Sequence, residues 1–256
     1  MMVTPKKRYG QHFLRDENTA RKIIGYINHD YPAILEIGPG TGVLSKYLLE
    51  DLLLDPVFLE VDGESVDHLQ SFYPAIAGRL IRADFLEFDL STFRPGTDKF
   101  TIIGNFPYNI STQILFRVLE FRDRIPEVIG MFQKEVAMRI AAPPGSKTYG
   151  ILSVLLQAYY HIDYLFTVNE SVFFPPPKVK SAVIRLRRND TAKLECDEAL
   201  FFRVVKTAFN QRRKTLRNSL RSLADQELLE GLQLATLRPE QLPVEDFVRI
   251  TAAITG

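Results

Sequence analysis

The fold of this 256-residue chain is decided by the stretch AILEIGPGTG, residues 33–42. Its first half, Ala33 to Ile37, is apolar apart from one acid, which is typical of a buried parallel strand. Three glycines then allow a tight turn and a close approach of a ligand to the backbone: Gly38, Gly40 and Gly42. Residues 43–53 carry apolar side chains at helical spacing, Leu52 among them, so the pattern predicts strand, glycine turn and helix.

A ligand above such a turn meets backbone N–H groups at a helix N-terminus, which suits a carboxylate or a phosphate. The spacing is G-x-G-x-G, whereas the dinucleotide fingerprint G-x-G-x-x-G would need glycine in place of Val43. On its own the turn could be an ordinary connection between a strand and a helix.

The second predicted strand, residues 56–61, points to a nucleoside ligand. It ends near Glu60, roughly 20 residues beyond the glycines, where a ribose hydroxyl pair is bound in nucleotide-binding folds. Glu60 is therefore predicted to bind the ribose, with Asp62 as the alternative for this role. We expect one of these two acids to bind ribose and the other to cap the helix that starts near Gly63.

The third predicted strand, residues 80–83, is followed by Asp84 and Phe85. An acid here can accept a hydrogen bond from an adenine amine, and the adjacent aromatic ring can pack on the base. Asp84 alone would be read as a solvated loop acid, so its role depends on the other motifs.

A fourth predicted strand ends in the motif NFPY, namely Asn105, Phe106, Pro107 and Tyr108. Open α/β sheets bind ligands at this end of their strands. An exocyclic adenine amine is a poor nucleophile and needs two hydrogen-bond acceptors, which the Asn105 side chain and a backbone carbonyl supply. Pro107 fixes the backbone direction, and Tyr108 offers a face on which a base can stack. With the glycine turn, the motif predicts methyl transfer from S-adenosylmethionine (SAM) to a nitrogen, although Asn-x-Pro is also good turn chemistry.

The chain resembles the small-subunit ribosomal RNA adenine N6-dimethyltransferases. The resemblance runs almost end to end and is carried by residues 6–14, 35–42, 105–108, 133–137, 147–154, 173–179 and 209–218. It implies a Rossmann-like, class I SAM-dependent methyltransferase sheet of α/β class with a small all-helical C-terminal domain. It also implies dimethylation of N6 of two adjacent adenosines in a hairpin near the 3′ end of small-subunit rRNA, within an immature small ribosomal subunit, as part of ribosome biogenesis.

The same resemblance implies further site residues. Gln11, His12 and Leu14 would close over the methionine end of the cofactor, and Phe173 would sandwich the target adenine against Tyr108. From the residues alone, His12 could be an ordinary packed histidine. Phe173 and Phe174 are neighbours, so only one of them can face the site. Many relatives have leucine where Phe106 stands, and only a backbone carbonyl is needed there.

The net charge is only +1, but the basic residues are clustered. Residues 51–98 hold ten acids and three bases, so the cofactor side is expected to be acidic and another face basic. A single basic run is as well explained by a solvated helix face, but several runs beside a base-binding motif favour RNA phosphate contacts. The predicted RNA-binding residues are Lys6, Lys7, Arg8, Lys178, Arg212, Arg213, Lys214 and Arg217.

The elements predicted from the pattern divide into two domains. Strands near residues 33–37, 57–61, 80–83, 100–105 and 127–132 alternate with helices, and 163–168 with 181–187 form a closing antiparallel pair. A helix is expected at 17–28. We place the boundary after residue 188, which gives a catalytic domain of residues 1–188 and a helical RNA- or ribosome-binding domain of residues 189–256 with helices at 197–209 and 213–223.

Composition excludes several other classes. One cysteine, Cys196, leaves no disulfide framework, and four scattered histidines indicate no metal site. No apolar run reaches the ~18 residues of a membrane span, and no signal peptide is visible. We therefore expect a cytoplasmic, monomeric protein without membrane or metal.

Two other functions fit parts of the pattern. The NFPY motif alone does not exclude an amino-methyltransferase that acts on large-subunit rRNA or DNA. A protein that only binds immature subunits as an assembly factor would share the basic runs. Residues 210–218 and the triple proline at 175–177 favour the small-subunit enzyme.

Overall fold

The structure is a computed structural model, and it describes residues 3–94 and 98–255. The chain divides into two compact units. The first consists of Met1–Ala137 and Asp163–Arg188, and the second of Met138–Ile162 and Asn189–Gly256. The expected boundary after Arg188 is therefore one of the points where the chain passes between units, and residues 138–162 are grouped with the C-terminal helices.

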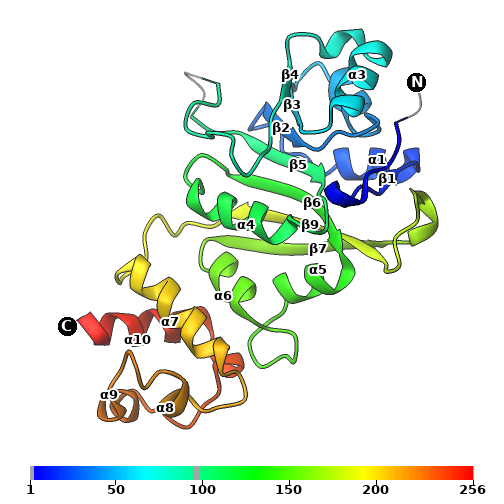
Figure 1. Ribbon diagram of the computed structural model, residues 1–256. Coiled ribbons are helices and arrows are strands. Elements are labelled where there is room, and N and C mark those ends of the chain that lie inside the picture. The colour runs from blue at the N-terminus through cyan, green and yellow to red at the C-terminus, as the bar shows by residue number, and fades with distance from the viewer. Residues whose placement is uncertain (1–2, 95–97, 256) are drawn as a thin grey trace. The chain divides into compact units, whose positions relative to one another are not determined.

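A seven-stranded sheet forms the centre of the described fold, in the order β4-β3-β2-β5-β6-β9-β7 (Figure 1). The strands are β2 (Ala33–Ile37), β3 (Asp55–Glu60), β4 (Leu80–Arg82), β5 (Thr101–Asn105), β6 (Glu127–Gln133), β7 (Tyr160–Val168) and β9 (Ser181–Arg188). The first five run parallel to one another, and β9 runs antiparallel to β6. The strands predicted at these positions are confirmed. The central strands β2 and β6 are buried on both faces, whereas the edge strands β4 and β7 are only partly buried.

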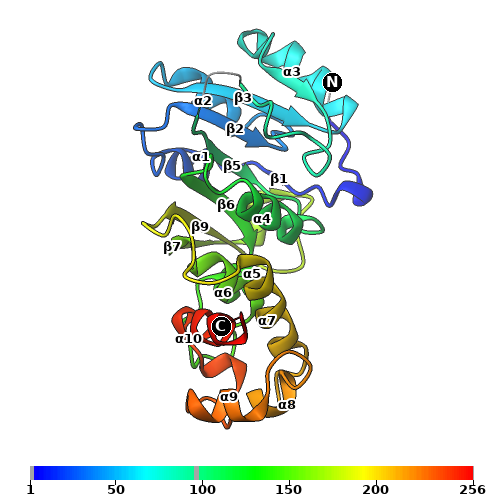
Figure 2. The ribbon, with the colours of Figure 1, turned by 90° about the vertical axis from the view of Figure 1, so that its left-hand side faces the viewer.

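Helices cover both faces of this sheet. They are α1 (Glu17–Ile24), α2 (Ser45–Glu50), α3 (Gly63–Phe72), α4 (Ser111–Glu120) and α5 (Lys134–Ile140). Helices α1 and α4 lie on opposite faces, as comparison of Figure 1 with Figure 2 shows. The two-residue strand β1 (Phe13–Leu14) pairs antiparallel with β8 (Phe173–Phe174), which ties the N-terminal arm to the segment before β9.

The second unit is helical apart from the start of β7. It contains α6 (Ile151–Gln157), α7 (Glu198–Asn210), α8 (Leu216–Ser219), α9 (Gln226–Gly231) and α10 (Val244–Thr255), the last four drawn in yellow to red in Figure 2. Asp197 caps α7 by accepting from the Leu200 N–H at 2.6 Å. The rings of Phe209 and Phe247 stack at 6.0 Å and join α7 to α10.

Three predicted helices are shorter than expected. The one predicted at 17–28 ends at Ile24, before Gly25. The one predicted at 43–53 covers only Ser45–Glu50. The one predicted at 213–223 covers only Leu216–Ser219. The N–H groups of Leu216 and Arg217 donate to the carbonyls of Leu237 and Ala235, and not to the carbonyls four residues before them, as a helix that began at residue 213 would require.

No helix in the described part of the chain is long and apolar enough to cross a membrane.

Candidate active site

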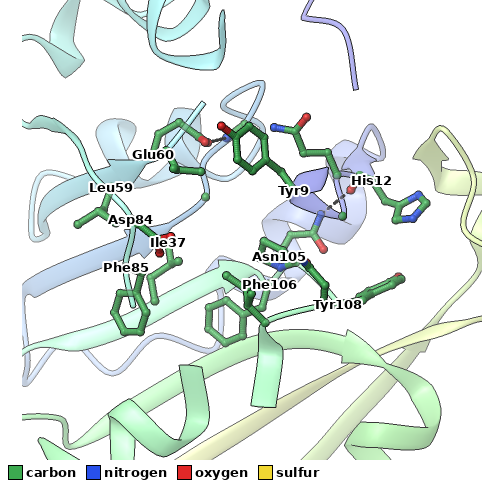
Figure 3. A pocket seen from close by; sticks show the side chains of 18 of the residues that line it. Tyr9, His12, Ile37, Leu59, Glu60, Asp84, Phe85, Asn105, Phe106 and Tyr108 are labelled. Carbon is green, nitrogen blue, oxygen red and sulfur yellow. Dashed lines mark hydrogen bonds between the residues drawn. The ribbon is translucent and has the colours of Figure 1, made fainter. Parts of the chain in front are cut away.

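A cavity of about 320 Å³ opens at the carboxyl ends of the parallel strands. Figure 3 shows Glu60, Asp84 and Phe85 on one side of it and His12, Asn105 and Tyr108 on the other. Its volume lies at the lower end of the range usual for small-molecule sites. The lining residues come from the N-terminal arm, the glycine turn, the ends of β3 and β4, and the segment after β5: residues 8–13, 37, 38, 40, 59–61, 83–85 and 105–110.

The glycine turn holds two of its three glycines at the cavity. Gly38 and Gly40 have φ of 65° and 59°, a region that side chains rarely adopt. Nothing lies within 4 Å of where a Gly38 Cβ would be, whereas a Cβ on Gly40 would meet the Phe13 ring at 2.8 Å. Gly42 does not line the cavity. A Cβ there would meet the Tyr73 ring at 2.5 Å, so this glycine is required by packing.

Glu60 and Asp62 have different surroundings. Glu60 is 3% exposed, lines the cavity, and accepts from the Gly40 N–H at 3.0 Å and the Asp62 N–H at 2.9 Å. Burial raises the pKa of Glu60. Asp62 is the N-cap of α3, as expected for one of the two acids. Burial pulls the pKa of Asp62 upward, but hydrogen bonds from Lys6 and Gln11 outweigh it and hold the pKa below its usual value.

Asp84 and Phe85 both line the cavity. One Asp84 oxygen accepts from the Leu86 N–H at 2.9 Å, which fixes the carboxylate, and Phe85 is 2% exposed. An acceptor and an aromatic ring are therefore adjacent, as an adenine site requires.

The NFPY segment is anchored to the sheet through Phe106. Phe106 is 1% exposed, its N–H donates to the Met131 carbonyl, and its ring packs edge-on against Phe132 at 5.2 Å. Gly104 and Gly130 make room for it, since a Cβ on either would approach the Phe106 ring to 2.9 or 2.5 Å. These two glycines were not singled out in the sequence. The feature that could have identified them is their pairing, because Gly104 on β5 lies directly opposite Gly130 on β6.

The side chain of Asn105 is oriented by the N-terminal arm. Its Nδ2 donates to the His12 carbonyl at 2.8 Å, which leaves its Oδ1 to act as an acceptor (Figure 3). The Tyr108 hydroxyl is 2.6 Å from Ser181 Oγ, and its ring stacks on His12 at 5.4 Å. Burial raises the pKa of Tyr108, although the Ser181 hydroxyl acts in the opposite direction. Tyr108 is thus neutral at physiological pH, and it lines the cavity.

The N-terminal arm is fastened over the cavity at several points. Lys6 Nζ lies 2.5 Å from Asp62 and 3.3 Å from Glu64. Gln11 accepts from the Lys6 N–H at 2.8 Å and donates to Asp62 at 3.2 Å. His12 Nδ1 donates to the Pro175 carbonyl at 2.7 Å. The arm therefore connects the start of α3, next to Glu60, to the segment around Asn105.

Besides Gly42, two predicted site residues lie away from the cavity. Leu14 and Phe173 are 2% and 4% exposed, belong to the hydrophobic core and do not line the cavity. They are direct partners in the β1–β8 pair. Their roles at the site remain predictions, and in this structure Phe173 does not face Tyr108 across the cavity.

Comparison with known proteins identifies the family. The family model described as ribosomal RNA adenine dimethylase matches residues 2–255. The chain belongs to the ribosomal RNA adenine dimethylase family. Two proteins called ribosomal RNA small subunit methyltransferase A are 54% identical (Cytophaga hutchinsonii, covering 99% of this chain and 98% of the relative) and 55% identical (Parabacteroides distasonis, 98% and 94%).

Solved structures share the fold of this chain. A dimethyladenosine transferase from Plasmodium falciparum has a TM-score of 0.79 at 23% identity, covering 93% of this chain and 96% of its own, which shows the shared fold. The 23S rRNA methyltransferase ErmE has a TM-score of 0.67 at 25% identity, covering 95% and 100%. The predicted fold class, the enzyme class and the cofactor SAM are confirmed by this family membership.

The cavity of this dimethylase fits SAM on its own evidence. The buried Glu60 carboxylate keeps unused lone pairs for ribose hydroxyls, and Asp84 with Phe85 suits the adenine. The open space at Gly38 lets a ligand lie against the backbone. Among residues 3–94 and 98–255 no group of metal-binding side chains comes together.

The predicted RNA-binding residues of the dimethylase fall into two groups. Lys6, Arg212 and Arg217 already have protein partners: Lys6 the two acids of α3, Arg212 the Lys147 carbonyl, and Arg217 the Glu230 carboxylate at 2.8 Å. The others are exposed and make no ion pair with any described residue, and they remain the better candidates for phosphate contacts: Lys7, Arg8, Lys178, Arg213 and Lys214.

Proposed function

We propose that this enzyme dimethylates N6 of two adjacent adenosines in a hairpin near the 3′ end of small-subunit (16S) rRNA, using SAM. The observation that carries the proposal is the Asn105 side chain, whose Nδ2 is held by the His12 carbonyl so that Oδ1 serves as an acceptor in the cavity. The relatives named ribosomal RNA small subunit methyltransferase A support this choice of substrate.

The residues of the NFPY segment would activate and orient the target amine. Oδ1 of Asn105 and the backbone carbonyl of Phe106 would accept its two N–H bonds, which favours a more tetrahedral nitrogen with an available lone pair. Tyr108 would stack on the base, and such stacking is worth about 1–3 kcal/mol per base. SAM, when bound, supplies a methyl group on a sulfonium, and the methylated amine then loses its proton to water. No side chain needs to act as a strong base.

The substrate is proposed to be a partly assembled small subunit rather than free RNA, and the enzyme is proposed to act in the cytoplasm as a monomer. Exposed basic side chains in both units, among them Lys178 and Arg213, would contact phosphates of a large RNA. We also propose that residues 189–256 provide RNA or ribosome contacts. Sedimentation of the pure enzyme, alone and with small subunits, tests both the monomer and the complex.

The direct test is methyl incorporation from labelled SAM into small subunits from cells that lack the modification, with large subunits and duplex DNA in parallel. Dimethyladenosine only in the small subunit is the expected result. Labelling of large subunits or DNA would move the enzyme to another amino-methyltransferase class.

Asn105→Ala separates catalysis from binding. It should abolish methyl transfer and leave small-subunit binding nearly unchanged, because Asn105 is not among the basic residues that contact phosphate. If wild type binds small subunits tightly without labelling them, the protein is an assembly factor instead.

A further inference from the structure

A row of exposed side chains beside the cavity has no part in the mechanism described so far. Phe174 is 38% exposed, and the Arg15 guanidinium lies over its ring at 4.0 Å from the centroid. Beyond it on the same segment, Lys178, Val179 and Lys180 are exposed as well. A planar cation over an exposed aromatic ring, followed by two lysines, combines the groups that bind single-stranded nucleic acid.

The segment of residues 174–181 is fixed to the active site at both ends. Near its start, the Pro175 carbonyl accepts from His12 Nδ1 at 2.7 Å. At its end, Ser181 Oγ is 2.6 Å from the Tyr108 hydroxyl. Both His12 and Tyr108 line the cavity. The exposed row therefore borders the cavity on the Tyr108 side.

The backbone decides which of the two adjacent phenylalanines faces outward. Phe174 pairs with Phe13 and Phe173 with Leu14 in the β1–β8 ladder. Successive side chains of a strand point to opposite faces, so when Phe173 enters the core Phe174 must point to solvent. The Arg15 N–H donates to the Val172 carbonyl at 2.8 Å, which holds the arginine beside that ring.

The proposed substrate explains why a second base site would be needed. A target adenosine has to leave its stack to enter the cavity, and its neighbour then loses a stacking partner. Both bases are substrates in turn, so both have to be accessible. Residues 174–181 contain no acid, which leaves the segment's positive charge free to attract the connecting phosphates.

We propose that Arg15 and Phe174 form a stacking platform for the nucleobase next to the target adenosine, with Lys178 and Lys180 on the adjoining phosphates. The proposal rests on the proposed function. It assigns to Phe174 a contact with the neighbouring base, and it leaves the target base with Tyr108.

The test compares Phe174→Ser with wild type in steady-state methylation of unmodified small subunits. We expect the KM for small subunits to rise about 10-fold, the value for loss of one base stack, while kcat and the Kd for SAM stay unchanged. Phe174→Trp should restore the wild-type KM, because any large aromatic ring can stack. Arg15→Lys should raise the KM, because an ammonium lacks the planar face.

Phe72→Ser is the matched control. Phe72 is also an exposed aromatic, 58% exposed and stacked on His68 at the end of α3, but it does not line the cavity. It should leave the KM for small subunits unchanged. The platform is refuted if Phe174→Ser keeps the wild-type KM, or if the Phe72 control raises KM equally.

The two proposals fail separately. If wild type does not label small subunits, the proposed function is wrong. If wild type labels them and Phe174→Ser behaves like wild type, only the platform is wrong. A loss of SAM affinity in Phe174→Ser equal to its rise in KM would also overturn the platform, since it would show a change in the cavity instead.

Discussion

Replacing Glu36 by glutamine should remove a large pH dependence from the stability of this fold. Glu36 is the next-to-last residue of β2, just before the glycine turn. It is 1% exposed, and its carboxyl group accepts a hydrogen bond from Ser45 Oγ at 2.7 Å. Burial raises the pKa of Glu36 to about 8, the Ser45 hydrogen bond opposes the shift, and the nearby Glu60 adds to it. At neutral pH the side chain is mostly a neutral acid, and glutamine is its neutral isostere.

The size and sign of the effect follow from the two pKa values. The pKa of Glu36 rises from an ordinary 4.5 to about 8 in the folded protein. At about 1.4 kcal/mol per unit, the interval corresponds to about 5 kcal/mol of unfolding free energy. Between these pH values the folded state binds one proton more than the unfolded state. The contribution is therefore fully present below pH 4.5 and is lost as the pH rises through about 8.

Urea unfolding of wild type and Glu36→Gln across this pH window measures the effect. The unfolding free energy of wild type should fall relative to that of the variant by several kcal/mol as the pH rises from about 5 to about 9. Ser45→Ala removes the hydrogen bond that lowers the pKa of Glu36, so it should move the loss to higher pH. Parallel stability profiles for wild type and Glu36→Gln would show that Glu36 titrates normally and would refute the reasoning.

Three further predictions concern the site and the RNA contacts. Glu60→Gln should weaken SAM binding about 10- to 100-fold in calorimetry. The amide N–H group would face a backbone N–H donor, and a buried donor left without its acceptor costs about 1–3 kcal/mol. Unchanged affinity would remove Glu60 from the ribose site. Replacing Arg213 and Lys214 together by glutamine should lower the salt slope of small-subunit binding by about 1.5, whereas an identical slope would show only a solvated face. Gly130→Ala should destabilise the fold by about 1–3 kcal/mol and reduce methyl transfer, because the added Cβ would press on Phe106. An unaltered melting temperature would contradict this.

The strands and the motif positions could be predicted because they depend on local sequence. The strand at 33–37 is apolar and bounded by glycine, and its observed limits are the predicted ones. The helix after it was predicted too long. Leu52 fits the helical spacing, yet it is 95% exposed, beyond the end of α2. Periodicity alone cannot tell an apolar residue in a surface loop from one on a buried face.

The exact lining of the cavity could not be predicted, because it depends on contacts between distant segments. The contact of Lys6 with Asp62, fifty-six residues later, has no local signal in the sequence. Whether Phe173 or Phe174 faces outward depends on the register of β1 with β8, which no local pattern reveals.

The packing of Phe106 restricts the order in which substitutions around it can accumulate during evolution. Its ring occupies the space that a Cβ on Gly130 would need. A Cβ there would also meet the Phe132 ring at 2.5 Å, so both rings have to be replaced by smaller side chains before an alanine at position 130 fits. The reverse order passes through an overpacked intermediate next to Asn105. Substitutions at these three positions are therefore strongly non-additive, and the accessible mutational path changes positions 106 and 132 before position 130.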